Sequence, residues 1–347
     1  MTGDGPGSPG GAFRGRRRSI RPGETELIQL GTVAPGQALP ALVTPAVAGV
    51  DLRAWASASR SRVEDLLHRH GALLFKGFGI ATVEQFEGFV DAACGPLLDY
   101  RHRVTRRTQL GGRVYSSTDH PPSLDLGLHN ETSYTRPWPM RIAFFCVQAA
   151  PEGGETPLAD SRRVLERIPE SVRTRFADRK LLYLRNSGDS VELSWQETFQ
   201  TDSREDVERQ CRESGMDCEW RADGRLRTRQ VCHAVARHPA TGEIVWFNQA
   251  HLFHSSCYTP GLLERMYADA APEDLPYNVY FGDGAAISAE ELRLVRRAYD
   301  EETRVFAWEE GDVLLLDNML VAHGRRPYRG PRRIAVAMAQ PRSDPGA

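Results

Sequence analysis

Two short and nearly unbroken apolar runs, VLLLD at 313–317 and RIAVAMA at 333–339, place the strongest constraint on the fold. Runs of this length, bounded by turn residues such as Gly311, are typical of buried strands. ALLFKGFGI at 72–80 and RIAFFCVQA at 141–149 have the same character. We therefore predict that strands form the centre of the fold.

Helical patterns flank these strands. Apolar residues recur at helical spacing over 51–70, and Thr82 with Gln85 forms a capping-box pattern that opens another helix. The helices are predicted mainly in three stretches, which are 51–95, 161–178 and 260–300. This mixture predicts a mainly β protein with flanking helices (α+β) and a jelly-roll core.

The 347 residues divide into a tail and one domain. Residues 1–22 are rich in Gly, Pro and Arg and lack the apolar surface that offsets chain entropy, so we expect a disordered tail. Residues 23–347 are expected to form a single domain. The long polar stretch at about 186–285 has no clear periodicity and is expected to be an insertion that covers one mouth of the barrel.

Composition argues against several classes of protein. The net charge is −2 and no run of 18 apolar residues occurs, so we expect neither a nucleic-acid nor a membrane partner. Four arginines within 14–18 suggest a nucleic-acid arm, but a solvated tail is favoured because no second basic patch supports binding. The N-terminus lacks the apolar segment of a secretory signal, so we expect a cytoplasmic protein with reduced thiols.

The segment LHNETSY at 128–134 carries the first candidate metal ligands, His129 and Glu131. Side chains at i and i+2 of an extended strand point to the same face, so the imidazole and the carboxylate project together. The zinc hydrolase pattern H-E-x-x-H needs a helix instead, and its spacing differs. A single H-x-E triplet is weak evidence, because an exposed strand face also tolerates it.

A second segment downstream strengthens the metal hypothesis. His323 follows an apolar strand and an Asp-Asn turn, and Arg333 lies ten residues later at the start of the next strand. If both strands line one barrel, His323 completes a two-histidine, one-carboxylate face that leaves open positions on iron(II) for O2 chemistry. Arg333 is then placed to bind a distal carboxylate through paired hydrogen bonds, and the hydroxyl of Thr156 to join it.

Three segments together resemble the taurine dioxygenase (TauD/TfdA) superfamily, and more narrowly its SyrP-like and clavaminate-synthase-like branch. They are LHNETSY, APEGGETPLAD at 150–160 and DNMLVAHGRRPYRGPRRI at 317–334, and the similarity covers roughly 70–340. Glu131 departs from the Asp that is commoner in the superfamily, and Glu is frequent in this branch.

The resemblance implies a double-stranded β-helix fold and a 2-oxoglutarate-dependent non-haem iron dioxygenase. It implies that His129, Glu131 and His323 bind Fe(2+), and that Thr156 and Arg333 bind the C5 carboxylate of 2-oxoglutarate. O2 is the second co-substrate of this class. Members of the branch hydroxylate amino acids in antibiotic and other natural-product biosynthesis, so we expect hydroxylation of an unactivated C–H bond in such a substrate.

The substrate is less well defined than the metal site. The branch acts on amino acids that are free or tethered to a peptidyl carrier protein, and both forms are kept open. The same cofactor chemistry also gives desaturation, cyclisation or epoxidation. Five polar residues are candidates for substrate contact, with a structural role as the alternative. Asn130, Tyr134 and Arg136 lie within or just after the first motif, and Asn248 and Gln249 lie in WFNQAHLFH at 246–254, which resembles a stretch common in the branch.

Two readings from other classes remain open. A zinc-dependent hydrolase would use the same His and Glu residues but would not need Arg333 or Thr156. A metal-binding jelly-roll module without turnover would not need all five positions. Release of succinate coupled to O2 uptake separates the dioxygenase from both.

Overall fold

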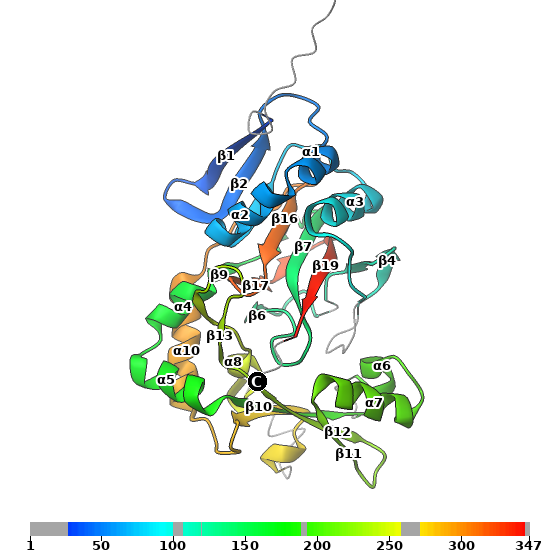
Figure 1. The fold of residues 1–347 in the computed structure, drawn as a ribbon, viewed down its shortest axis with the longest axis vertical. Helices are drawn as coiled ribbons and strands as arrows, with labels where there is room; N and C mark the ends of the chain where they lie inside the picture. The colour runs from blue at the N-terminus through cyan, green and yellow to red at the C-terminus, as the bar shows by residue number, and fades with distance from the viewer. Residues whose placement is uncertain (1–26, 100–106, 119, 189–192, 258–270, 344–347) are drawn as a thin grey trace, which may run out of the picture.

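A computed structural model describes residues 27–99, 107–118, 120–188, 193–257 and 271–343 (Figure 1). The tail predicted at 1–22 lies outside these residues. Every apolar run predicted to be a strand takes part in one large sheet. The order of its eight strands is β1-β2-β3-β16-β7-β19-β5-β4. Their bounds are Ile28–Ala34 for β1, Gln37–Pro45 for β2, Ala72–Phe75 for β3, Val313–Asp317 for β16, Trp138–Gln148 for β7, Arg333–Arg342 for β19, Val114–Ser116 for β5 and Gln109–Gly111 for β4.

A second sheet of three strands faces the first and completes the jelly roll. Its order is β6-β17-β9, and the strands span Leu126–His129, Val321–Arg325 and Leu158–Asp160. His323 in β17 pairs directly with His129 in β6 across the antiparallel ladder. The chain approaches closely at Gly324, where an added Cβ would lie 2.5 Å from the carbonyl oxygen of Leu126. This sheet therefore brings together two histidines that are far apart in the sequence.

The central strands of the large sheet are buried on both faces, which explains their unbroken apolar runs. Along β16, Val313 and Leu315 pack into the core beneath the N-terminal helices. The alternate residues Leu314 and Leu316 pack into the core between the two sheets. Because successive side chains of a strand point to opposite faces, a strand in this position needs apolar residues at every place.

Three helices cover the outer face of the large sheet (Figure 1): α1 (Leu52–Ala58), α2 (Arg60–His70) and α3 (Val83–Cys94). The helix predicted over 51–70 is two helices, because the chain breaks at Ser59, which ends α1 and begins α2. The capping box predicted at Thr82 and Gln85 is confirmed at the start of α3. Local capping signals were thus reliable, whereas the break within 51–70 had no Gly or Pro to mark it.

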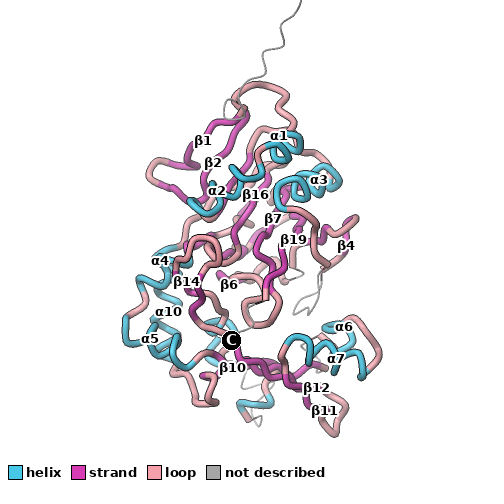
Figure 2. Tube along the Cα trace, viewed as in Figure 1, coloured by secondary structure: helices cyan, strands magenta, loops and turns pink. Residues whose placement is uncertain are grey.

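The remaining elements pack beyond the small sheet (Figure 2). One group holds helices and short strands: α4 (Ser161–Arg167), α5 (Glu170–Arg179), α8 (Ala250–Phe253), α10 (Ala289–Glu302), β13 (Val235–Arg237) and β14 (Ile244–Trp246). The short strands β8 (Glu152–Gly153) and β18 (Tyr328–Arg329) pair with each other in a separate sheet. The other group is a sheet of order β11-β12-β10-β15 with two helices. It comprises β11 (Asp217–Trp220), β12 (Leu226–Cys232), β10 (Leu181–Ser187), β15 (Tyr277–Phe281), α6 (Trp195–Phe199) and α7 (Arg204–Ser214). The stretch predicted to be an insertion thus contains more regular structure than its weak periodicity indicated.

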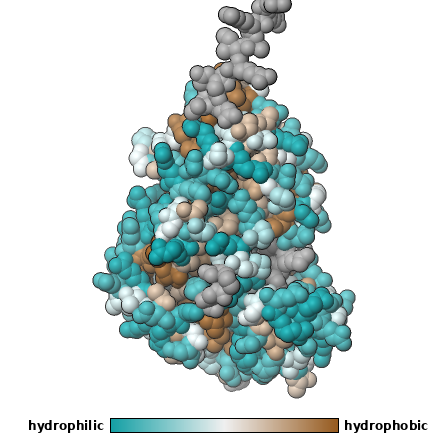
Figure 3. Space-filling model, viewed as in Figure 1, coloured by the Kyte–Doolittle hydropathy of each residue, from teal (hydrophilic) through white to brown (hydrophobic). Residues whose placement is uncertain are grey.

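The surface in the view of Figure 3 is mostly hydrophilic, with apolar side chains in scattered patches. None of the helices in the described part of the chain combines the length and the apolar character that crossing a bilayer requires.

Candidate metal centre

Three side chains converge where the small sheet meets the interior of the jelly roll. The rings of His129 and His323 lie 4.5 Å apart between centroids. Oε2 of Glu131 is 3.9 Å from Nε2 of His129 and 3.8 Å from Nε2 of His323. The candidate ligand atoms all lie within 4.8 Å of one another, so they can bind a single ion. Two imidazoles and one carboxylate are the donor set of oxygen-activating iron sites.

Glu131 lies in a turn and not on the predicted strand. Strand β6 ends at His129, and Glu131 begins a turn, so the i and i+2 alternation of a strand does not apply between them. The side chain of Asn318 holds the Glu131 backbone instead. Its Oδ1 accepts from the Glu131 N–H at 2.8 Å, and its Nδ2 donates to the Glu131 carbonyl at 2.9 Å.

The two imidazoles are prepared for a metal ion by burial and by one hydrogen bond. Nδ1 of His129 donates to the Gly127 carbonyl at 2.9 Å, which leaves the lone pair of Nε2 facing Glu131. Burial lowers the pKa of His129, and it lowers the pKa of His323 well below the usual value. Both rings are therefore neutral near pH 7, as metal ligation requires.

Arg107 is a site residue that no sequence motif selects. Its Nη2 lies 3.2 and 3.1 Å from the two carboxylate oxygens of Glu131, and 9% of the residue is exposed. It belongs to a polar stretch without a motif, and only the three-dimensional contact reveals it. The guanidinium fixes the orientation of the carboxylate and adds positive charge to the site.

A small cavity of about 30 Å³ is lined by both histidines and by side chains that can bind an anion. Thr156 accepts a hydrogen bond from the Trp308 indole at 3.0 Å, so its O–H remains able to donate. Burial, followed by the charge of Arg325, lowers the pKa of Arg332 to about 10, so this guanidinium is charged at neutral pH. The lining includes three arginines and both histidines: Arg107, Arg325, Arg332, His129 and His323.

The structure places Arg332, and not Arg333, at this cavity. The alternate residues Arg332, Ile334 and Val336 line it, whereas Arg333 is exposed. Ala335 points to the core beneath the helices. The prediction of Arg333 as the carboxylate-binding residue thus conflicts with its position, because a shift of one residue along a strand changes the face. Nε of Arg332 also donates to a backbone carbonyl at 2.9 Å, which orients the guanidinium.

None of the five residues predicted to contact substrate lines the cavity that holds the histidines. Asn130 and Asn248 are fully buried and hydrogen-bond to neighbouring groups of the protein. Gln249 donates to the carbonyl of Asn130 at 2.7 Å. Tyr134 packs against Tyr183 of β10 and Phe253 of α8, and Arg136 donates to a backbone carbonyl. Each of the five side chains contacts neighbouring groups of the protein, and their contact with substrate stays a prediction.

A second cluster, formed by His68, His238 and Asp317, also has candidate ligand atoms within 4.8 Å of one another. Here the carboxylate is already occupied, because Oδ2 of Asp317 accepts from Arg141 and from Nε2 of His238 at 3.0 Å. Burial alone would raise the pKa of Asp317, but the His238 hydrogen bond and the Arg141 charge outweigh it and lower that pKa. We interpret this cluster as a buried ion-pair network and not as a metal site.

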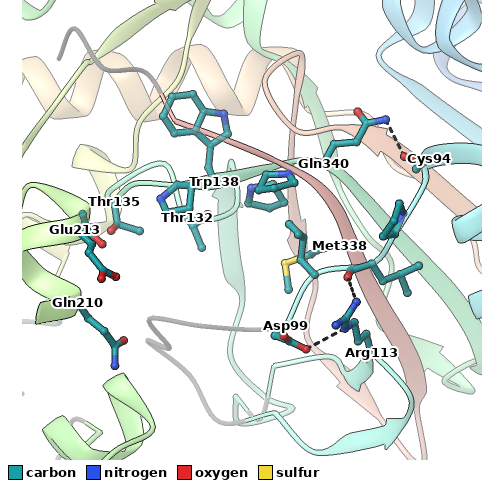
Figure 4. Close-up of a pocket in the computed structure, with 17 residues that line it drawn as sticks. Cys94, Asp99, Arg113, Thr132, Thr135, Trp138, Gln210, Glu213, Met338 and Gln340 are labelled. Carbon is teal, nitrogen blue, oxygen red and sulfur yellow. Dashed lines mark hydrogen bonds and ion pairs between the residues drawn. The ribbon is translucent and has the colours of Figure 1, made fainter. Parts of the chain in front are cut away.

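A larger cavity of about 610 Å³ is separate from the one that holds the histidines, and none of the three candidate ligands lines it (Figure 4). Met338 and Gln340 line it from the same face of β19 as the residues of the small cavity. Thr132 lines it from the turn after Glu131, Trp138 from the start of β7, and Glu213 from α7. Its wall is largely apolar, so it offers space for an organic molecule.

The metal-free protein is expected to lose stability on acidification, because several histidines are buried as neutral rings. Burial lowers the pKa of His251 to about 3, and Nε2 of this ring bonds the Leu128 carbonyl at 2.9 Å. The unfolded chain binds a proton near pH 6.5, so stability is lost as pH falls from 6.5 toward 3. The loss is about 1.4 kcal/mol per pH unit for each such ring. The full slope is reached only below pH 6.5, so this ring contributes a total loss of about 1.4 kcal/mol between pH 7.5 and 5.5. Urea unfolding of the His251→Gln variant at pH 7.5, 6.5 and 5.5 should show a total loss smaller by this amount, and an unchanged loss would contradict the assignment.

Comparison with known proteins agrees with this geometry. Residues 35–338 match the family model described as "Taurine catabolism dioxygenase TauD, TfdA family". The chain is 38% identical over 283 residues to the dapdiamide synthesis protein DdaC of Enterobacter agglomerans, which covers 82% of this chain and 86% of that protein. It is 30% identical over 340 residues to a clavaminate synthase-like protein of Arabidopsis thaliana, covering 91% and 99% of the two chains. The structure of PvcB from Pseudomonas aeruginosa has a TM-score of 0.54 at 16% identity and covers 90% of this chain and 91% of its own.

Proposed function

Because the chain belongs to the TauD and TfdA family of dioxygenases, we propose that His129, Glu131 and His323 bind the iron(II) of an enzyme that oxidises an amino acid or a close derivative. The family uses Fe(2+), 2-oxoglutarate and O2, and the jelly-roll fold is the one expected for it. The observation that carries the proposal is the convergence of three ligand atoms within 4.8 Å beside a cavity lined by arginines.

The ligand set fits iron(II) in its chemistry as well as in its spacing. Both imidazoles are neutral, that of His323 is buried and that of His129 is partly buried, and the single carboxylate offsets part of the metal charge. When bound, iron with 2-oxoglutarate supplies the O2-dependent oxidation. The protein holds the ligands in fixed directions through the two strands that carry His129 and His323. The apolar ring of Phe144, 5.0 Å from the His323 ring, shields the site from water.

The co-substrate is proposed to bind in the small cavity. Arg332 provides a charged, partly desolvated fork for the distal carboxylate, and Thr156 adds a hydroxyl donor. Arg333 remains the residue that the family resemblance selects. We favour Arg332 because it lines the same cavity as Thr156 and His323, whereas Arg333 is exposed.

The substrate proposed is an amino acid or an amino-acid-derived molecule in natural-product biosynthesis, hydroxylated at an unactivated C–H bond. The relative that takes part in dapdiamide synthesis supports the biosynthetic setting. The cavity of about 610 Å³ offers space for an organic molecule larger than the co-substrate. Free and carrier-tethered forms of the substrate are both included in the proposal and are separated by experiment.

The test is formation of succinate with uptake of O2 in the presence of iron(II), 2-oxoglutarate and a panel of amino acids. Each amino acid is supplied free and loaded on a peptidyl carrier protein. We expect one member to stimulate succinate formation, and the mass of its product identifies the reaction. A gain of one oxygen atom indicates hydroxylation or epoxidation, and a loss of two hydrogens indicates desaturation or ring closure.

The same assay separates the alternative classes. A zinc-dependent hydrolase or a binding module without turnover would release no succinate under any condition. The His323→Ala variant is the control, because it retains the cavity but lacks one metal ligand. Equal succinate formation by this variant would contradict the proposed site.

A further inference from the structure

We propose that Asn318 is a positioning residue for the metal ligand Glu131, an inference that rests on the metal site proposed above. Asn318 is fully buried in the turn between β16 and β17. The same turn leads into the strand that carries His323, five residues later. Asn318 thus belongs to the segment that supplies one metal ligand and hydrogen-bonds the residue that supplies another.

The side-chain amide of Asn318 forms three hydrogen bonds, through its oxygen and its NH2 group. Oδ1 accepts from the Glu131 N–H at 2.8 Å, and Nδ2 donates to the carbonyls of Glu131 and Pro139, each at 2.9 Å. A primary amide combines an acceptor with two donors, whereas a carboxylate lacks the donors and a hydroxyl has only one. The side chain therefore pairs with the Glu131 backbone as a neighbouring strand would.

Glu131 needs such a partner because it has left the sheet. Strand β6 ends at His129, and the turn that begins at Glu131 is buried, so its backbone groups cannot rely on bulk water. Without the Asn318 amide, this N–H and this carbonyl would have to move to find other partners. Such a movement would carry the carboxylate away from the two imidazoles.

The turn that holds Asn318 is itself anchored. Oδ1 of Asp317 accepts from two backbone N–H groups of the same turn, and its Oδ2 bonds Arg141 and His238. The backbone of Asn318 is also paired on both sides, donating to the carbonyl of Met140 at 2.9 Å and accepting from the side chain of Asn130 at 2.7 Å. The buried ion-pair network thus fixes the turn, and the turn fixes Glu131.

Asn318 offers a cleaner test than Arg107, which bonds the carboxylate of Glu131 directly and carries charge. Replacing Asn318 changes no charge near the metal. The matched control is Asn186 of β10, a buried amide that also makes three hydrogen bonds but belongs to the sheet formed by β10, β11, β12 and β15. A general effect of losing a buried amide would be the same at both positions.

The experiment is titration of the metal-free full-length protein with Mn²⁺, followed by the electron paramagnetic resonance signal of the free ion. For Asn318→Ala and Asn318→Ser, we expect the Kd for Mn²⁺ to rise about 10–100-fold, as is typical when the outer support of a ligand is lost. For Asn186→Ala, we expect Mn²⁺ affinity within about twofold of the unsubstituted protein, although thermal unfolding shifts. Circular dichroism establishes whether each variant is folded. The serine variant keeps a polar side chain at position 318, so it serves as a second variant if the alanine variant does not fold.

A double substitution separates action through Glu131 from a general structural effect. In a Glu131→Ala background, adding Asn318→Ala should leave the weakened Kd for Mn²⁺ unchanged. An equal further loss in that background, or an unchanged Kd for the single Asn318 variants, would overturn the inference. If the unsubstituted protein itself does not bind Mn²⁺, the metal site fails first, so the two failures are distinguishable.

Discussion

The Arg332→Ala variant is expected to raise the KM for 2-oxoglutarate by about 10²-fold or more, whereas Arg333→Ala should change it by no more than about twofold. Removing one partner of a desolvated charge pair costs about 2–5 kcal/mol, and an exposed side chain without buried partners costs little. Arg332 lines the cavity with Thr156 and His323, and Arg333 does not. Steady-state succinate formation at varied 2-oxoglutarate concentration measures the effect.

Two further variants test the geometry of this carboxylate site. Arg332→Lys keeps the charge but not the two-pronged donor, so its KM should lie between those of the unsubstituted enzyme and the alanine variant. Thr156→Val removes the hydroxyl at nearly constant volume and should give a smaller rise than Arg332→Ala. A large rise for Arg333→Ala with a normal Arg332→Ala would restore the residue selected by the family resemblance.

The choice between the two arginines shows what the sequence alone leaves undecided. The apolar run at 333–339 predicts the strand correctly, but an Arg-Arg pair presents a guanidinium to the interior in either register. The structure also has an irregularity in the pairing of β19 with β7 between Arg333 and Ile334. The face that each arginine occupies depends on this irregularity, and no local pattern marks it.

The central strands and the candidate ligand triad could be predicted from the sequence for a physical reason. Strands such as β16, buried on both faces, must be apolar throughout, and an unbroken apolar run is visible in one sequence. The ligands His129, Glu131 and His323 belong to chemically unusual types in ordered motifs. The convergence of the two histidines required only that their strands be neighbours, which the pairing of His323 with His129 provides. The position of Glu131 depends in addition on the turn that follows β6 and on its hydrogen bonds with Asn318.

Residues that act through contacts with distant positions of the chain could not be predicted from the sequence. Arg107 and Asn318 lie 24 and 187 positions from Glu131, and neither belongs to a motif with a known function. The candidates Asn130 and Tyr134 were selected because they are near the ligands in sequence. Proximity in sequence does not place them at the small cavity, since the chain becomes buried directly after Glu131, and their contact with substrate stays a prediction.

Metal binding should depend on His323 and not on the second histidine cluster. For His323→Ala we expect the binding stoichiometry of Co²⁺ or anaerobic Fe²⁺ to fall from one to near zero at micromolar metal. The expected loss of affinity exceeds the about 10–100-fold typical of outer-shell changes, because one of three ligands is removed. Succinate formation coupled to substrate should be lost with it. Isothermal titration calorimetry and metal analysis after gel filtration measure the two quantities.

The matched control for this prediction is His68→Ala, because His68 belongs to the other group of potential ligands. Asp317 in that group is already neutralised by Arg141 and bonded to His238, so a metal ion would have to displace both. Removal of His68 should therefore leave one metal ion bound with unchanged affinity. If His68→Ala loses the ion and His323→Ala retains it, the metal ion binds at the cluster that contains His68 and Asp317. Glu131, Arg332 and Thr156 then lose the roles assigned to them.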